Sequence, residues 1–243
     1  MAQSQSNDNP EIGAVAFHTS IADEFGASYR EDPNRLDRIV IWRTYLARYV
    51  SHAVLAYDLG CGPAVLTCEV AKRADKVIAI DGSAGMLEVA KRTIETAGVS
   101  NVTFEQQLLP FTPGEDHPPA SCVISSSVIE YLEDLDEAFQ FVRKLISPDG
   151  VFIFSLSNKL SISRKLVRLF HRVTGRPRYF GHVKHFVTVH EITKRLEAAK
   201  FVCVEHEYFG GADRLNTALS KFMPRNRSTN MILFVARPVS QES

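Results

Sequence analysis

Two patterns of apolar residues alternate along the chain, one typical of strands and one typical of helices. Short, β-prone apolar runs stand at 53–59, 76–80, 101–105, 122–125, 151–157 and 230–237, and another begins at Phe201. Between them, apolar residues recur three and four apart, which is the spacing of an amphipathic helix. Strands that alternate with helices favour one mostly parallel sheet with helices on its faces.

Helix-start and turn signals refine this pattern. Helices are expected over 17–29, 33–49, 64–73, 83–97, 135–146 and 188–199. Thr188 and Glu191 have the spacing of a capping box, and so do Asp134 and Glu137. Four prolines between residues 110 and 119 argue against a helix between the third and fourth strands,.

The length indicates one large domain. A chain of 243 residues is long enough for one α/β domain with a substantial core and short for two,. We expect a single domain over 13–237, with a helical lid at 13–51 and a basic helical insertion at 159–184. The segments 1–12 and 238–243 are expected to be tails, the first of them disordered.

The composition limits the kinds of binding partner that we expect. Lys and Arg total 28 and Asp and Glu total 28, so the net charge gives no reason to expect a nucleic acid,. The four cysteines lack metal-ligand spacing, and we expect reduced thiols in a cytoplasmic protein without a metal site,. An apolar signal core and a run of about 18 apolar residues are both missing, so we expect a soluble protein. It is expected to be a monomer or a homodimer.

The most informative stretch is YDLGCGPA at 57–64, where an apolar strand passes through a tight turn into a helix. Gly60 and Gly62 bring the main chain close to a ligand, and Asp58 places a carboxylate at the strand's carboxyl end, where open α/β sheets bind ligands. Val65 stands where a dinucleotide fingerprint has its third glycine, and no P-loop lysine follows. The pattern therefore favours a site for an amino-acid-like cation and a ribose.

A second carboxylate follows one strand later. Asp81 ends the second strand, and Gly82 follows it. There Asp81 is positioned to accept hydrogen bonds from both hydroxyls of a ribose. The alternative is that Asp81 only caps the next helix, which Ser83 can do alone.

With these motifs the sequence resembles the class I S-adenosylmethionine-dependent methyltransferases, and within them the small-molecule branch related to those of ubiquinone biosynthesis. The resemblance covers about 15–237 and rests on YDLGCGPA, Asp81, the block SSSVIEYLEDLDEAFQFVRKLISPDGVFIFSLSN at 125–158 and GHVKHFVT at 181–188. It implies a Rossmann-like α/β fold with a seven-stranded, mostly parallel sheet in the order 3-2-1-4-5-7-6, in which strand 7 is antiparallel. It also implies methyl transfer from S-adenosylmethionine to an oxygen, or a nitrogen, of a small molecule, with S-adenosylhomocysteine as product.

The resemblance also implies cofactor contacts. Met86 is expected to pack on the adenine, Gln107 to accept a hydrogen bond from the adenine amino group, and Arg43 to reach the methionine carboxylate. Tyr29 is expected in a lid that folds over the site. The full set of expected cofactor contacts is Asp58, Gly60, Cys61, Gly62, Asp81, Gly82, Met86, Gln107, Ser126, Tyr29 and Arg43.

Acceptor activation is expected from four residues near the carboxyl edge of the sheet. Glu130 and Tyr131 follow the fourth strand, and Tyr131 stands where the quinone branch has histidine. His182 and His185 lie on the segment that enters the helix at 188–199. A histidine with a pKa near 6.5 can accept a proton at neutral pH; the alternative for each is a structural hydrogen-bonding role.

The segment 159–184 carries eight Lys or Arg and no acidic residue, in a chain without net charge. Apolar residues alternate with these charges at helical spacing. The segment is expected to pack on its own domain, to cap an anionic substrate, or to touch an anionic membrane while collecting a lipid-like substrate.

Two other functions stay open. A non-catalytic methyltransferase-like binding protein is permitted by Ala64, at the family's third glycine, and by Gln107. A nicotinamide-dependent oxidoreductase uses a similar sheet, but Val65 and Asp58 disfavour it.

Overall fold

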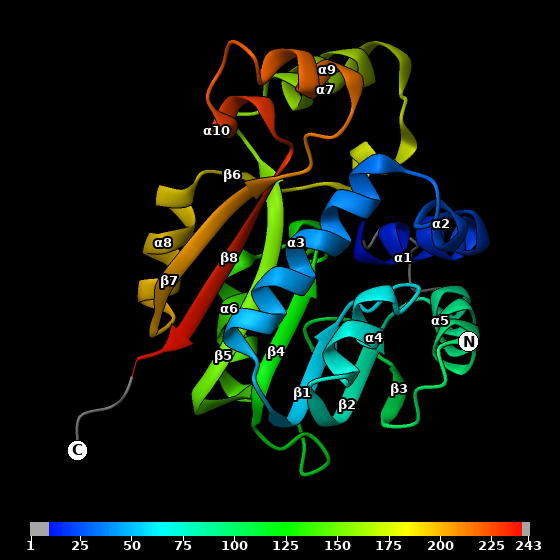
Figure 1. Ribbon diagram of the computed structural model, residues 1–243, viewed down its shortest axis with the longest axis vertical. Coiled ribbons are helices and arrows are strands. Elements are labelled where there is room, and N and C mark those ends of the chain that lie inside the picture. Colours follow the sequence, from blue (N-terminus) through cyan, green and yellow to red (C-terminus); the bar gives the residue numbers. More distant parts are fainter. Residues whose placement is uncertain (1–9, 240–243) are drawn as a thin grey trace, which may run out of the picture.

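The computed structural model describes residues 10–239 and contains one twisted sheet at its centre (Figure 1). The strand order is β3-β2-β1-β4-β5-β8-β7, and β6 adds to β5 off this path. The sheet is parallel except at β8, which runs antiparallel to β5 and β7. The strands are β1 (Ala53–Leu59), β2 (Ala74–Asp81), β3 (Val102–Gln106), β4 (Ala120–Ser126), β5 (Ile146–Asn158), β6 (Phe186–Val187), β7 (Phe201–Phe209) and β8 (Met231–Pro238).

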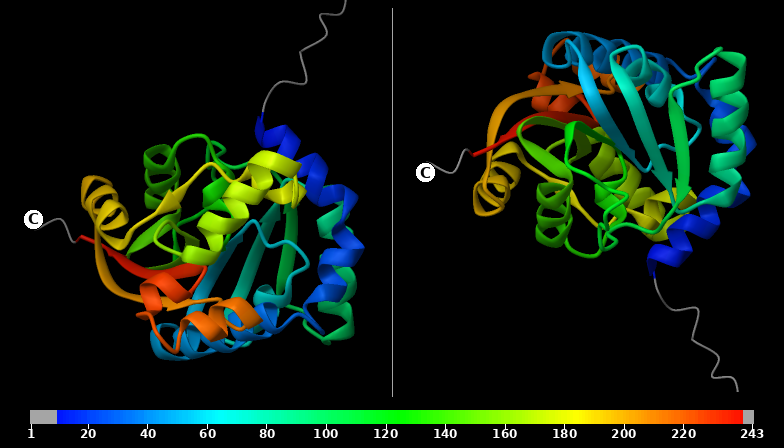
Figure 2. Two further views of the ribbon diagram at one scale, coloured as in Figure 1. Left: turned by 90° about the horizontal axis from the view of Figure 1, so that it is seen from above. Right: turned by 90° about the horizontal axis from the view of Figure 1, so that it is seen from below.

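Helices cover both faces of the sheet (Figures 1 and 2). Apolar side chains of α3 (Pro33–Tyr49) and α4 (Val65–Ala71) pack on one face, and those of α6 (Leu135–Leu145) and α8 (Val189–Ala198) pack on the other. Close to the β3 edge of the sheet lies α5 (Ala84–Thr96). The N-terminal helices α1 (Pro10–Ser20) and α2 (Ala22–Ser28) pack against α5. The result is a three-layer α/β domain with the sheet in the middle.

The expected fold class is confirmed. The observed order equals the expected 3-2-1-4-5-7-6, because the short β6 only shifts the numbers of the last two strands. The described chain has no helix between β3 and β4, as the prolines predict. The capping box of Thr188 and Glu191 is present, and Asp134 caps α6 by accepting from the amides of Asp136 and Glu137.

One local expectation is wrong. The helix expected over 17–29 is broken at Ile21, which separates α1 from α2. The tails expected at 1–12 and 238–243 fall partly outside the described residues. Within the described part, Pro10 already begins α1, and Pro238 still belongs to β8.

Three further helices form a cap above the carboxyl ends of the parallel strands, at the top of Figure 1. They are α7 (Ile162–Thr174), α9 (Arg214–Leu219) and α10 (Arg225–Ser228). The expected basic insertion supplies α7, whereas α9 and α10 come from the link between β7 and β8. Within the described residues, no helix is long and apolar enough to cross a membrane.

Candidate functional site

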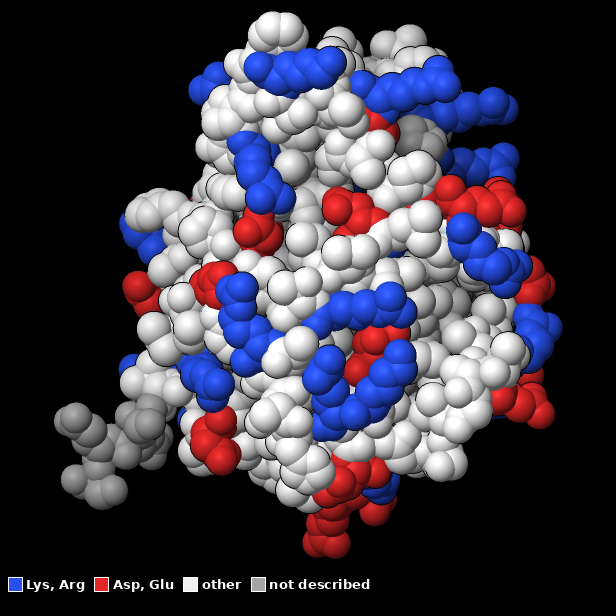
Figure 3. Space-filling view, in the orientation of Figure 1, with Lys and Arg blue, Asp and Glu red and all other residues white. Residues whose placement is uncertain are grey.

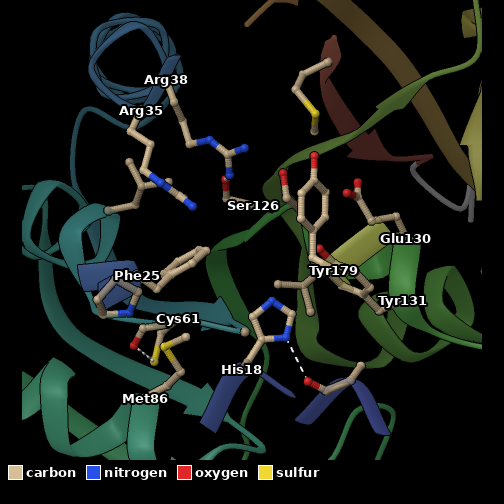
Figure 4. A pocket seen from close by; sticks show the side chains of 18 of the residues that line it. His18, Phe25, Arg35, Arg38, Cys61, Met86, Ser126, Glu130, Tyr131 and Tyr179 are labelled. Atoms are coloured by element: carbon tan, nitrogen blue, oxygen red, sulfur yellow. Dashed lines mark hydrogen bonds between the residues drawn. The ribbon is translucent and has the colours of Figure 1, made fainter. Parts of the chain in front are cut away.

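A cavity of about 550 Å³ opens at the carboxyl edge of the sheet, between the N-terminal helices and the cap (Figure 4). Its first half is lined by the turn after β1, the end of β2 and residues of α1 and α2. Its second half is lined by residues of α3, β4, α7 and β8 together with Glu130, Tyr131 and Tyr179. The volume lies within the range of small-molecule sites.

The turn after β1 requires glycine at its first position. Gly60 has a φ of +73°, and a Cβ placed on it would lie 2.2 Å from Val128 Cγ2. Its amide donates to the carbonyl of Ile80, which ties the turn to β2. The main chain therefore approaches the cavity without a side chain in between.

Ala64 adopts a left-handed conformation, with a φ of +59°, just before α4. This conformation is unfavourable for an L-residue with a Cβ, and glycine adopts it freely. Ala64 is thus a strained replacement for the third glycine, but α4 still begins at Val65.

Two carboxylates face the cavity beside this turn. Asp81 accepts hydrogen bonds from the amides of Gly62 at 2.8 Å and Ser83 at 2.9 Å. Burial raises the pKa of Asp81, and these two hydrogen bonds oppose the shift. Burial also raises the pKa of Asp58 to about 7, although the Thr67 hydroxyl donates to it at 2.6 Å.

Arg35, Phe25 and Tyr29 close the cavity over the turn. The Arg35 guanidinium lies 3.8 Å from the centroid of the Phe25 ring and 4.8 Å from that of Tyr29. Its Nε is buried and has no hydrogen-bond partner. A guanidinium with spare donors in this position can receive a carboxylate.

His18 lines the same cavity, and sequence reasoning missed it. Its Nδ1 lies 2.8 Å from the carbonyl of Ala14, which can only accept, so Nδ1 carries the proton,. The other nitrogen lies on the cavity side of the ring (Figure 4). Burial lowers the pKa of His18, although Asp81 opposes the shift. The ring is therefore neutral and offers a lone pair to the cavity.

Glu130 and Tyr131 line the second half of the cavity. The Glu130 carboxylate accepts hydrogen bonds from the amide and the hydroxyl of Ser157, at 3.0 and 3.1 Å. Burial raises its pKa, and Arg164 and Arg38 oppose the shift. Burial raises the pKa of Tyr131 as well, so the phenol is neutral.

Most of the expected site residues meet at this cavity. Those that line it are Tyr29, Asp58, Gly60, Cys61, Gly62, Asp81, Gly82, Met86, Ser126, Glu130 and Tyr131. They come from segments that lie far apart in the sequence.

Four expected site residues do not line the cavity, which corrects their expected positions. Arg43 is more than half exposed and pairs with Glu69 at 2.8 Å. Gln107 is exposed, while Leu108 and Leu109 after it face the cavity. His182 packs against Phe17, and His185 Nε2 lies 3.0 Å from the carbonyl of Leu132.

Between residues 10 and 239, no group of three or more His, Cys, Asp or Glu side chains is arranged to hold a metal ion.

Comparison with known proteins identifies part of the chain. Residues 56–150 match the family model of a methyltransferase domain. The ubiquinone biosynthesis O-methyltransferase of Actinobacillus pleuropneumoniae is 29% identical over 42% of this chain and 45% of that protein. The carboxy-S-adenosyl-L-methionine synthase of a Nitratiruptor species is 22% identical over 85% of each chain. The chain spans about 40% of the length of two further methyltransferases that are 33% and 30% identical to it.

A solved structure extends the likeness to the whole domain. The complex of DhpI with SAH aligns with 97% of this chain and 100% of that chain, with a TM-score of 0.66 and 21% sequence identity. At this identity the likeness shows the fold.

Proposed function

Since the chain contains a methyltransferase domain and has the class I S-adenosylmethionine-dependent methyltransferase fold, we propose that it transfers a methyl group from S-adenosylmethionine to a small molecule. The observation that carries the proposal is a cavity in which the Gly60–Gly62 turn, Asp58 and Asp81 adjoin a second polar half. The acceptor atom is an oxygen or a nitrogen.

The residues of the first half fit S-adenosylmethionine. Asp58 offers a carboxylate to the ammonium group, and Asp81 offers two oxygens to the ribose hydroxyls. The spare donors of Arg35 suit the methionine carboxylate, so Arg35 takes the role expected of Arg43. Met86 and Leu108 give apolar surface for the adenine, in place of a contact from Gln107.

When bound, S-adenosylmethionine supplies a methyl group already activated on a sulfonium. The chain's own task is to hold an acceptor in line and to exclude water, which can contribute about 7 to 11 kcal/mol to lowering the barrier. The aromatic residues of α1 and α2 cover the cavity for this purpose.

His18 is the proposed proton acceptor for a hydroxyl substrate. Its tautomer is set by Ala14, and its free nitrogen faces the cavity. His182 and His185 do not line the cavity. Glu130 lines it, but its carboxylate is held by the amide and hydroxyl of Ser157, whereas the second nitrogen of His18 is free to take a proton. Glu130 and Tyr131 are therefore proposed as contacts to the acceptor.

Methyl transfer to a panel of phenols and amines, detected by mass spectrometry, tests this function. His18→Gln is expected to lower kcat for a hydroxyl acceptor about 10²- to 10⁴-fold with the affinity for S-adenosylhomocysteine unchanged. His182→Gln and His185→Gln serve as controls and should stay within a few-fold of the wild type. Binding of S-adenosylmethionine without transfer to any acceptor would instead support the non-catalytic alternative.

We also propose that the cap touches an anionic membrane. Leu166, Leu169, Phe170 and Val173 lie on one face of α7 and are 50 to 80% exposed. Lys and Arg side chains lie over the cap in Figure 3. A helix with an exposed apolar stripe among cations suits the surface of an anionic bilayer.

Vesicle sedimentation tests the membrane contact. The wild type should bind vesicles that contain anionic lipid, and Leu169→Ser with Phe170→Ser should remove the binding. Val54→Ser is the control, because Val54 is 70% exposed but lies at the start of β1, away from the cap. Failure of the wild type to bind would exclude the contact.

We propose that the protein acts in the cytoplasm. All four cysteines are free thiols, which suits the cytoplasm,.

A further inference from the structure

Two arginines in the second half of the cavity lack a carboxylate partner. Arg38 Nη1 donates to Ser126 Oγ at 3.1 Å, and Arg164 Nη1 donates to Tyr179 Oη at 3.2 Å. Neither makes an ion pair within 4.0 Å among the described residues. Other arginines of the chain do form such pairs, namely Arg43, Arg48, Arg92, Arg195 and Arg225.

Arg164 is the less satisfied of the two. Its Nη2 faces the sulfur of Met231 at 3.3 Å, and its Nε is buried without any hydrogen-bond partner. A guanidinium withdrawn from water needs charged or strongly polar partners, and a phenol and a thioether are weak substitutes. The side chain therefore has capacity left for an anion.

Glu130 is the nearest acidic group, and it does not neutralise both cations. It lies beyond ion-pair distance of either arginine, and both its oxygens accept from Ser157. Burial raises its pKa, and Arg164 and Arg38 oppose the shift. Two guanidinium groups thus share one buried carboxyl group.

The other acidic residues on this side of the cavity are engaged in helix caps. Asp32 accepts from the Asn34 amide, and Asp213 accepts from the amide and side chain of Asn216. Neither of these carboxylates forms an ion pair with Arg38 or Arg164. Arg35 lies near Arg38, but its spare donors are assigned to the methionine carboxylate. Arg38 and Arg164 therefore keep donors that can bind an anion.

We propose that the methyl acceptor carries an anionic group, a carboxylate or a phosphoryl group, that binds between Arg38 and Arg164. The inference rests on the proposed function and adds the substrate class to it. Val167, Phe209 and Leu215 line the same half and provide an apolar wall for the body of the acceptor. The acceptor is therefore a small amphiphilic acid whose charged end is held away from the Gly60–Gly62 turn.

Arg38 and Arg164 come from different parts of the fold. Arg38 projects from α3 toward Ser126 (Figure 4). Arg164 comes from α7 in the cap. An anion held by both would join the cap to α3 and so position the acceptor beside the proposed cofactor site.

Calorimetry with benzoate and phenyl phosphate, in the presence of saturating S-adenosylhomocysteine, tests the proposal. At least one of the two anions should bind the wild type saturably, and benzyl alcohol, which is neutral, should bind at least tenfold more weakly. The stronger of the two anions identifies the group as carboxylate or phosphoryl. Arg38→Gln and Arg164→Gln should each weaken anion binding at least tenfold, and Arg38→Lys, which keeps the charge, should weaken it less.

Matched controls separate this inference from the proposed function. Arg43→Gln on α3 and Arg168→Gln on α7 lie outside the cavity and should leave anion binding within twofold. Binding of S-adenosylhomocysteine without binding of either anion, or equal loss in the control variants, overturns the arginine pair and leaves the proposed function standing. Failure of S-adenosylhomocysteine itself to bind overturns the proposed function, and the inference with it.

Discussion

The two halves of the cavity are built in different ways. The first half depends on backbone conformation at the ends of adjacent strands, where Gly60 and Asp81 are fixed by hydrogen bonds between β1 and β2. The second half is assembled from side chains of α3, α7 and the segment after β4, which meet only in the tertiary structure. The first half is thus set by the sheet, and the second is set by the cap.

Because of this difference, the two halves tolerate different substitutions without loss of the fold. The turn does not tolerate a side chain at Gly60, because an added Cβ would overlap Val128 in the segment after β4. A wall made of long side chains can exchange them with little effect on the sheet. We therefore expect substitutions in the first half to affect both stability and cofactor binding, and those in the second to affect the acceptor alone.

The largest effect is expected for Gly60→Ala. The added methyl group would overlap Val128, and the residue would keep a left-handed φ of +73°. Overpacking costs about 1 to 3 kcal/mol and the conformation about 1 to 2 kcal/mol, so unfolding in urea should show a loss of roughly 2 to 5 kcal/mol.

Gly98→Ala is the control for Gly60→Ala. Gly98 has a φ of +65°, and an added Cβ would meet nothing within 4 Å. This variant should lose only the cost of the left-handed conformation, about 1 to 2 kcal/mol, without an overpacking cost. Equal losses in the two variants would contradict the claim that the turn is packed against Val128.

Cofactor affinity should rise with pH below about 7. The pKa of Asp58 is about 7 in the free protein, and a cation bound beside it would favour the ionised form. Binding of S-adenosylmethionine at pH 6 should therefore release a proton, and affinity should rise up to about tenfold per pH unit.

Calorimetry in buffers of different ionisation enthalpy measures this proton release, and Asp58→Asn should abolish it. The Asp58 carboxyl group also affects the pH dependence of the free energy of unfolding, and in the opposite direction. Because its folded pKa is raised, it stabilises the free chain at low pH and loses that contribution as pH rises from about 4 to about 7,. A pH-independent affinity in the wild type would place the cation away from Asp58.

The smallest effect is expected for Ala64→Gly. Relief of the left-handed conformation gains about 1 to 2 kcal/mol, and loss of the buried methyl group costs about 0.8 kcal/mol. The free energy of unfolding should therefore rise by about 1 kcal/mol or less, without change in cofactor affinity. A clear destabilisation would show that the methyl group of Ala64 matters more for packing than its backbone strain.

The difference between the two halves of the cavity also explains which parts of the fold and of the site could be predicted from the sequence. The fold and the positions of Asp58, Gly60 and Asp81 follow from strand ends and turn chemistry, which are local. Arg43 and Arg35 lie on one helix, but Arg43 is about 12 Å further along its axis and meets Glu69 of α4,. Nothing in a helical pattern indicates which of the two reaches the cavity.

The sequence pattern did not indicate His18 as a site residue, for a related reason. The apolar spacing of Phe17, Ile21, Phe25 and Tyr29 describes one continuous helix, whereas the structure has two helices that meet at Ile21, and His18 lines the cavity from the first of them. His182 and His185 lie on a 3₁₀ turn and an irregular segment, whose path no periodicity predicts. The residues that set the acceptor half thus depend on how separate segments dock.

Calorimetric titration of S-adenosylmethionine and S-adenosylhomocysteine into the wild type and Asp81→Asn tests the central claim most directly. Both ligands should bind the wild type with one site per chain, NAD should not bind, and loss of charge-assisted hydrogen bonds in Asp81→Asn should weaken binding about 10- to 150-fold. Asp75→Asn, an exposed change at the other end of β2, should leave affinity unchanged. Absence of binding to the folded wild type, or undiminished binding to Asp81→Asn, would contradict the account.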